Sequence, residues 1–343
     1  MQRKPNPSVA KKVIWSIRRH LPFPVDEIVE CTEVTEYSYI NFVFRLRVRS
    51  GRRIIAIYLK CAYTYLAADL RPPFHFSHIK YPVQRIEGEI RALKLLNNVW
   101  GPDIVPSVLY SDVKKGIMVL SDVGRGGALL VKEFGRNRVH SEIAAVLGVL
   151  MGKLHGSTYG RSVAWSTVAR WRKENTGYIF GHIAGAMERY CGKKALHNFI
   201  VSAQSAPQSL TWTDPIHRNM FVRPHGVVQC IDFDVMQTFD PAYDLGLITA
   251  HWKWMELKGI VAVRSDARKF LKNFFRSYQK QLLKYSVPLK DQKTIIDRAH
   301  RWMGIYLVYR ADHKVNRFFG SDAQWEQRVR EEGIRCFQNV PSL

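Results

Sequence analysis

The sequence predicts an α+β protein of two lobes, with a small antiparallel sheet first and a larger, mainly helical part after it. Apolar and polar residues alternate along 41–60, which is typical of paired strands. The glycine-rich segment 124–127 follows, and helical periodicity then dominates, notably over 265–285 and 291–312. With 343 residues, 46% of them hydrophobic, the chain can fill one large or two moderate cores, which excludes a disordered or fibrous protein.

The first predicted element is an amphipathic basic helix over residues 8–21. Val9, Val13, Ile17 and Leu21 recur at helical spacing, with lysines and arginines between them. Such a helix either packs on the protein body or lies on a membrane surface. No signal peptide is evident, and no apolar run reaches the 18 to 20 residues that span a bilayer. We therefore expect a cytoplasmic location, with peripheral membrane contact as an option.

A β-hairpin is predicted next, from a strand at 41–49, a turn at Ser50-Gly51 and a strand at 54–60. In the second strand Lys60 projects from the face opposite the aliphatic row. A helix is expected over 84–97 and further strands near 105–110 and 116–120. We place the boundary between the lobes after residue 123, which gives an N-lobe of 1–123 and a C-lobe of 124–343.

The C-lobe is expected to open with a helix that starts at the cap residue Ser141 and stops at Gly156. The five cysteines have no metal-ligand spacing, so we expect reduced thiols.

The charge balance is strongly basic, because 52 lysines and arginines face 29 acids, for a formal net charge of +23. This excess favours acidic partners: an anionic small molecule, an anionic membrane or nucleic acid. A solvated basic surface is the other interpretation. No heptad seam indicates an oligomeric state.

The chemistry is concentrated in residues 210–245. Asp214 is followed five positions later by Asn219, and a second short strand ends at the sequence Ile-Asp-Phe-Asp, in which Asp232 is the first acid. Phosphoryl transfer needs a carboxylate beside the attacking hydroxyl, and a carboxylate with an amide oxygen for Mg²⁺. Lys60 and a glutamate of the next helix, Glu89 or Glu87, add the pair that positions nucleotide phosphates in kinases.

These motifs resemble those of the aminoglycoside phosphotransferase and choline kinase group, which has a protein-kinase-like fold. The resemblance rests on Asp214 to Asn219, on Ile231-Asp232-Phe233-Asp234 and on the run Asp-Pro-Ala-Tyr-Asp-Leu at 240–245. Leu154-His155 and the helix near Arg85 are similar as well. The similarity extends over about residues 28–310 and is specific in its second half.

The resemblance implies an ATP- and Mg²⁺-dependent phosphotransferase acting on a hydroxyl group. Asp214 would orient or deprotonate that hydroxyl, Asn219 and Asp232 would bind Mg²⁺, and Lys60 would contact the nucleotide phosphates. Glu89, preferred over Glu87, would hold Lys60. Ser38 and Asn41 would contact phosphate from the loop 35–41.

Three further acids near the motifs, Asp240, Asp244 and Asp234, could serve structure instead of chemistry. Asp240-Pro241 is a good helix start, whereas Asp244 is expected to brace the catalytic loop. Asp234 either shares the metal or is solvated.

The sequence departs from the family pattern at three places. Trp212 stands where the family has a histidine that supports the loop, the loop 35–41 lacks glycine, and Tyr58 replaces a small residue near adenine. The nucleotide could therefore differ from ATP.

The leading hypothesis is an active kinase for a small acceptor that is anionic or sugar-like. Two alternatives stay open. One is a sugar or lipid kinase of the lipopolysaccharide-core type at the membrane surface, to which the Ile-Asp-Phe-Asp motif is similar. The other is an inactive kinase-like adaptor that binds nucleic acid or an acidic partner, for which the arginines of strand 41–49 are the candidate surface.

Overall fold

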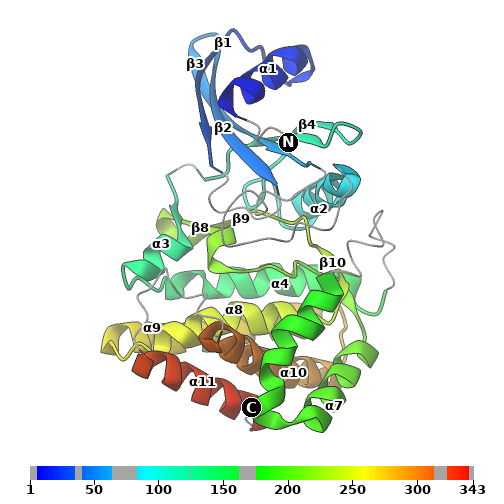
Figure 1. The fold of residues 1–343 in the computed structure, drawn as a ribbon, viewed down its shortest axis with the longest axis vertical. Coiled ribbons are helices and arrows are strands. Elements are labelled where there is room, and N and C mark those ends of the chain that lie inside the picture. The colour runs from blue at the N-terminus through cyan, green and yellow to red at the C-terminus, as the bar shows by residue number, and fades with distance from the viewer. Residues whose placement is uncertain are drawn as a thin grey trace. The chain divides into compact units, whose positions relative to one another are not determined.

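The structure, a computed structural model, describes residues 6–34, 41–63, 83–124, 126–161, 175–312 and 323–339. It divides into two compact units, Met1–Arg125 and Gly126–Leu343 (Figure 1). Ser38 lies outside the described residues.

The first unit is built on one antiparallel sheet with the strand order β1-β2-β3-β5-β4. Its strands are β1 (Glu27–Glu33), β2 (Phe42–Ser50), β3 (Arg53–Cys61), β4 (Val108–Asp112) and β5 (Ile117–Ser121). The predicted hairpin is β2–β3, with Phe44 opposite Leu59 and Val43 opposite Lys60. Because successive side chains along a strand point to opposite faces, Lys60 and Leu59 lie on different faces of this sheet.

Helix α1 (Pro7–Ile17) covers one of those faces. Asn6 caps it by accepting a hydrogen bond from the Val9 amide at 3.1 Å, and Pro7 occupies the first turn. Ala10, Ile14 and Ile17 are buried in one cluster with the apolar row of β2 and β3. Packing on the sheet is thus the fate of this helix, although Trp15 and Val9 stay exposed.

Helix α2 (Ile86–Val99) follows a short 3-10 turn, Val83–Arg85. Its apolar stripe includes Ile90 and Leu93, which are buried. Arg85, only 2% exposed, anchors its start by donating to the Tyr63 carbonyl at 2.6 Å and to Asn41 Oδ1 at 3.1 Å.

The second unit is mainly helical and carries two small sheets, β6–β8–β9 and β7–β10 (Figure 1). The strands are β6 (Ala128–Leu129), β7 (Ser209–Thr211), β8 (Met220–Arg223), β9 (Val227–Cys230) and β10 (Gln237–Phe239). The shorter helices are α3 (Leu130–Gly135), α6 (Glu188–Cys191), α7 (Lys193–Ser205) and a π-helix, Tyr178–Ile183. The longer helices are α4 (Ala144–Thr158), α8 (Pro241–Glu256), α9 (Val261–Lys284), α10 (Leu289–Asp312) and α11 (Ala323–Gln338).

The expected end of α4 at Gly156 is wrong. The helix continues to Thr158, and Ser141 starts a 3-10 turn without a side-chain cap. Gly148, Gly152 and Gly156 recur every fourth residue and form a smooth stripe against α9 and the residue after it. A Cβ atom at Gly152 would lie 2.6 Å from Gln281 Cβ, and one at Gly156 would lie 2.6 Å from Tyr285 Cδ2. Gly156 therefore serves close packing and does not stop the helix.

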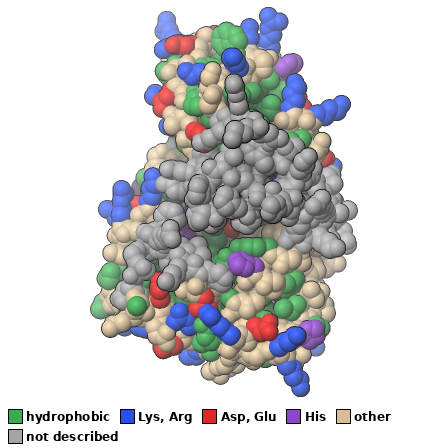
Figure 2. Space-filling model, in the orientation of Figure 1, with side chains coloured by type: hydrophobic (Ala, Val, Ile, Leu, Met, Phe, Trp, Pro, Cys, Tyr) green, Lys and Arg blue, Asp and Glu red, His purple; other side chains and the backbone are tan. Residues whose placement is uncertain are grey.

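Among the helices of the described segments, none combines the length and the apolar composition that crossing a bilayer requires. All five cysteines are free thiols. Lysine and arginine side chains are spread over the visible face of each unit among acids and apolar groups (Figure 2).

Candidate active site

In the first unit, Lys60 and Glu89 form a buried ion pair. Lys60 Nζ lies 2.9 Å from Glu89 Oε1 and 2.7 Å from Oε2, and the two side chains are 5% and 2% exposed. The geometry arises because Lys60 points to the face opposite α1, while Glu89 lies in the first turn of α2. Glu87 instead pairs with Arg91 at 2.6 Å on the helix surface. The two nearby glutamates thus have different partners, as their places on different helical faces require.

Asn41 is hydrogen-bonded to the residue that precedes α2, the helix that carries Glu89. Its side chain is 2% exposed, and its Oδ1 accepts the hydrogen bond from Arg85. Asn41 therefore holds the start of α2, and a phosphate contact by this residue would come from another of its polar atoms.

In the second unit, Asp214 and Asn219 are joined directly. The Asn219 amide nitrogen donates to Asp214 Oδ2 at 2.8 Å and to the Asp214 carbonyl at 3.0 Å. Since the nitrogen is engaged, Asn219 Oδ1 is the atom that could bind a metal. Arg218 Nη2 lies 3.9 Å from Asp214 Oδ2. Burial raises the pKa of Asp214 to about 6, with Arg218 opposing the shift and Asp232 adding to it.

The backbone before Asp214 is strained and firmly held. Thr213 has φ 63°, which is rare for a β-branched residue. The buried carboxylate of Asp244 accepts from the amides of Trp212 at 2.7 Å and Thr213 at 2.8 Å. His155 in turn lies 3.1 Å from Asp244 and 3.1 Å from the Tyr278 hydroxyl. Asp244 thus braces the loop that presents Asp214.

Trp212 connects this loop to the second acidic motif. Its indole Nε1 donates to the Asp232 carbonyl at 2.9 Å, and its ring stacks on Phe233 with centroids 4.8 Å apart. The residue that departs from the family pattern therefore supports the acidic loop directly.

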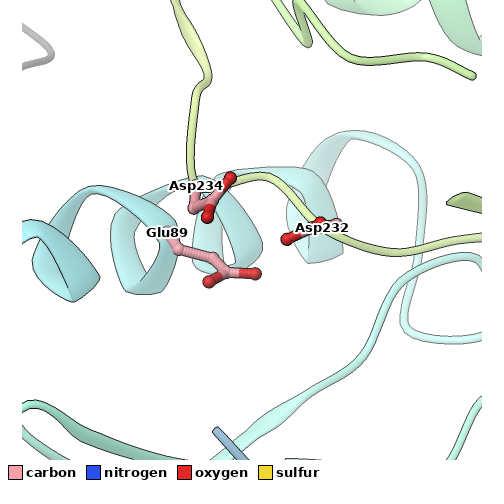
Figure 3. Close-up of side chains that lie close together, drawn as sticks. All are labelled: Glu89, Asp232 and Asp234. Carbon is pink, nitrogen blue, oxygen red and sulfur yellow. The ribbon is translucent and has the colours of Figure 1, made fainter. Parts of the chain in front are cut away.

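Asp232 and Asp234 lie on the loop that follows β9, whereas Glu89 comes from α2 (Figure 3). Asp232 has φ 66°, which turns the chain sharply after the strand. The Ile231 amide donates to the Asn219 carbonyl at 3.0 Å, so the two motifs are tied together at their backbones. Asp234 is 7% exposed.

The donors of the second unit fit Mg²⁺ in chemical type. Mg²⁺ prefers carboxylate and amide oxygens, which Asp232 and Asn219 offer. After burial, the negative charge of Asp232 adds to the raised pKa of Asp214, because like charges repel. A divalent cation would relieve this repulsion.

Asp240 has the capping role that the sequence predicts. Its side chain accepts from the Ala242 amide at 3.1 Å, with Pro241 in the first turn of α8. It also binds Arg298 of α10 through both oxygens, at 2.9 and 3.0 Å.

The sequence pattern indicates no function for Arg218 or Arg310. Arg218 could have been found from its place within the Asp214-to-Asn219 loop, but nothing in a helical pattern distinguishes Arg310 from a surface arginine.

Comparison with solved structures establishes the fold as that of small-molecule kinases. A choline kinase from Cryptosporidium parvum matches with a TM-score of 0.54 over 95% of this chain and 95% of its own, at 12% identity. A spectinomycin phosphotransferase in complex with ADP and spectinomycin matches with 0.51 over 96% and 93%, at 13%. A macrolide 2'-phosphotransferase from Brachybacterium faecium matches with 0.50 over 97% and 100%, at 13%. The chain thus has the protein-kinase-like two-lobe fold of the choline kinase and aminoglycoside phosphotransferase group.

No protein-family model matches the sequence, and no curated protein sequence matches it. At 12 to 13% identity the likeness to solved structures shows the fold alone.

Proposed function

We propose that the protein is a kinase that transfers the γ-phosphoryl group of ATP, with Mg²⁺, to a hydroxyl group of a small molecule. The single observation that carries this proposal is the group of Asp214, Asn219 and Asp232 on two loops that are tied together at their backbones. The spectinomycin phosphotransferase with this fold contains ADP, which supports an adenine nucleotide.

Each group has a part in the proposed reaction. Asp214 orients the acceptor hydroxyl and takes its proton, while the acceptor oxygen bonds to the γ-phosphorus and ADP leaves. Asn219 Oδ1 and Asp232 would hold Mg²⁺, which neutralises charge on the phosphates. Lys60, held by Glu89, would bind nucleotide phosphate, and Ser38 and Asn41 remain candidates for the phosphate loop.

The test is thermal unfolding of the wild type and of Asp232→Asn, with and without Mg²⁺ and ATP. A ligand that binds only the folded state raises the melting temperature by mass action. We expect a Mg²⁺-dependent shift in the wild type that is lost in Asp232→Asn. The control is Asp266→Asn, the same chemical change on the exposed face of α9, which should keep the shift. Equal shifts in all three proteins would refute the metal site.

The contacts of the first unit support an adaptor less well than they support a kinase. The adaptor's candidate surface includes Arg47 and Arg49 of β2, but these pair with Glu30 at 3.4 Å and Glu27 at 2.9 Å of β1. These glutamates therefore offset much of the positive potential of the β2 arginines.

Membrane contact is a secondary proposal and rests on α1. This helix exposes Trp15 and Val9 beside Lys11 and Lys12. Deleting α1 would uncover the core that it buries, so Trp15→Ser with Lys11→Glu and Lys12→Glu is the better test. Loss of binding to vesicles of anionic lipid, with ATP binding kept, would support attachment, and unchanged vesicle binding would exclude it.

A further inference from the structure

Arg310 is the unusual cation of the second unit. It lies in the last turn of α10 and is only 9% exposed, yet no hydrogen bond or ion pair reaches its guanidinium from the described part of the chain. Its buried Nε likewise has no hydrogen-bond partner among the residues that the structure describes. Buried arginines are normally paired, because an ionised group loses its hydration on burial.

Two acids of the second unit, Asp312 and Asp214, have other partners. Asp312, two residues along α10, binds Arg189 and Arg330 and accepts from the Tyr190 hydroxyl at 3.2 Å. Asp214 faces Arg218 and Asn219. What surrounds Arg310 is aromatic: its guanidinium carbon lies 5.1 Å from the ring centroid of Trp254 and 5.9 Å from that of Tyr306. Aromatic faces stabilise a cation that lies over them. The N–H groups of a guanidinium point outward in its own plane, so they stay available to an anion.

A chain of ring contacts connects Arg310 with the catalytic loop. The ring centroids of Tyr306 and His251 are 5.3 Å apart, and those of His251 and His217 are 4.3 Å apart. His217 belongs to the loop that runs from Asp214 to Asn219.

We propose that Arg310 binds an anionic group, a phosphate or a carboxylate, carried by the acceptor whose hydroxyl meets Asp214. This inference rests on the proposed kinase function and narrows its substrate to an anionic hydroxyl compound. A planar guanidinium can bind two oxygens of such a group at once. Because the guanidinium of Arg310 is already buried and held against aromatic rings, the anionic group of the acceptor would supply the hydrogen-bond partner that it lacks in the described structure.

The experiment measures phosphate binding, with inorganic phosphate as the probe and the melting temperature of the full chain as the readout. Wild type is compared with Arg310→Met and with Arg276→Met, which removes the same charge from the exposed face of α9. We expect Arg310→Met to weaken phosphate binding at least tenfold, which is about 1.4 kcal/mol, and Arg276→Met to bind as the wild type does. Without phosphate, Arg310→Met should melt no lower than the wild type, because it removes an unpaired buried charge.

Several outcomes would overturn the proposal. Phosphate affinity kept in Arg310→Met would do so, as would equal losses in both variants. A lower melting temperature with unchanged phosphate affinity would mean that the arginine serves only the stacking with Trp254 and Tyr306. If Arg310→Met does not fold, Arg310→Lys replaces it, since lysine keeps the charge but lacks the planar fork. It should weaken phosphate at least threefold, and wild-type affinity would refute the proposal.

The Mg²⁺-ATP response separates this site from the nucleotide site. Arg310→Met should keep the Mg²⁺-ATP shift, whereas Asp232→Asn should lose it and keep phosphate binding. Loss of the Mg²⁺-ATP shift in Arg310→Met would assign the arginine to the nucleotide and refute an acceptor site. Phosphate binding that depends on Arg310, without any Mg²⁺-ATP shift in the wild type, would refute the kinase proposal and leave an anion site.

Discussion

Asp214→Asn should make the protein more stable at neutral pH while it removes activity. Burial raises the pKa of Asp214 to about 6, whereas an unfolded aspartate titrates near 3.9. Below about pH 4 the carboxyl is protonated in both states and contributes no difference. As the pH rises towards 6 and beyond, the folded state holds a proton that the unfolded state has released, and the free energy of unfolding falls.

The magnitude follows from the size of the shift. About two pKa units at 1.36 kcal/mol each give a destabilisation of about 3 kcal/mol above pH 7. Asparagine is neutral and can still accept the hydrogen bond from Asn219. For a lobe of this size, 1 kcal/mol corresponds to about 2–4 °C, so Asp214→Asn should melt roughly 6–12 °C higher at pH 8.

The assay is thermal unfolding of both proteins at pH 4 and pH 8, with Asp266→Asn as the control for removing an exposed carboxylate. The stability gain of Asp214→Asn should be present at pH 8 and absent at pH 4, and the control should show no pH-dependent difference. A gain of equal size at both pH values would refute the reasoning, because it would not come from ionisation of Asp214. Once an acceptor is identified, wild-type kcat/KM should fall below about pH 6.

Four further predictions follow from particular contacts. Lys60→Met should lower the unfolding free energy by about 3–5 kcal/mol because it removes the cation that pairs with the buried Glu89 carboxylate, and Lys60→Met with Glu89→Leu should recover most of it in thermal or denaturant unfolding. Gly152→Ala should destabilise by about 1–3 kcal/mol, because its Cβ would meet α9. Gly88→Ala in α2, where no atom of the described residues lies within 4 Å, should stabilise by about 0.5–1 kcal/mol; equal effects would contradict the packing argument. Trp212→Phe should weaken the Mg²⁺-ATP shift by about 0.5–1.5 kcal/mol, since the hydrogen bond to the Asp232 carbonyl is lost, and an unchanged shift would exclude this support. Asp244→Ala should abolish phosphoryl transfer or folding, because the amides of Trp212 and Thr213 lose their acceptor; an active variant would show that the brace is dispensable.

The elements with a clear hydrophobic period could be predicted from the sequence. The hairpin β2–β3, the helix α2 and the long helices α9 and α10 lie where the pattern places them, because each buries one face. The hydrophobic pattern does not predict strand β1. Its residues alternate poorly in burial, since it lies at the edge of the sheet. The signal that could have found it is charge, because Glu27 and Glu30 complement Arg49 and Arg47 of β2.

The residue types of the site could be predicted from the sequence. The contacts that hold its loops in place could be predicted less well. Asp214, Asn219 and Asp232 follow a spacing that chemistry restricts. The hydrogen bond of Trp212 to the Asp232 carbonyl depends on how two loops meet, which no local pattern encodes. The packing of Gly156 against Tyr285 is likewise a tertiary contact. From the sequence alone, a glycine at this position predicts the end of a helix.

The free-energy costs gathered around Asp214 bear on whether the protein acts as an enzyme or only as a binding module. Thr213 and Asp232 both have positive φ without being glycine, and Asp214 is a partly buried carboxylate whose pKa is raised by burial and by the charge of Asp232. Each feature destabilises the folded state, and asparagine at 214 or glycine at 213 would relieve it. A module that used this fold only to grip a partner would gain stability from such changes without loss. A base that must take a proton near neutral pH needs the raised pKa, so the arrangement favours catalysis.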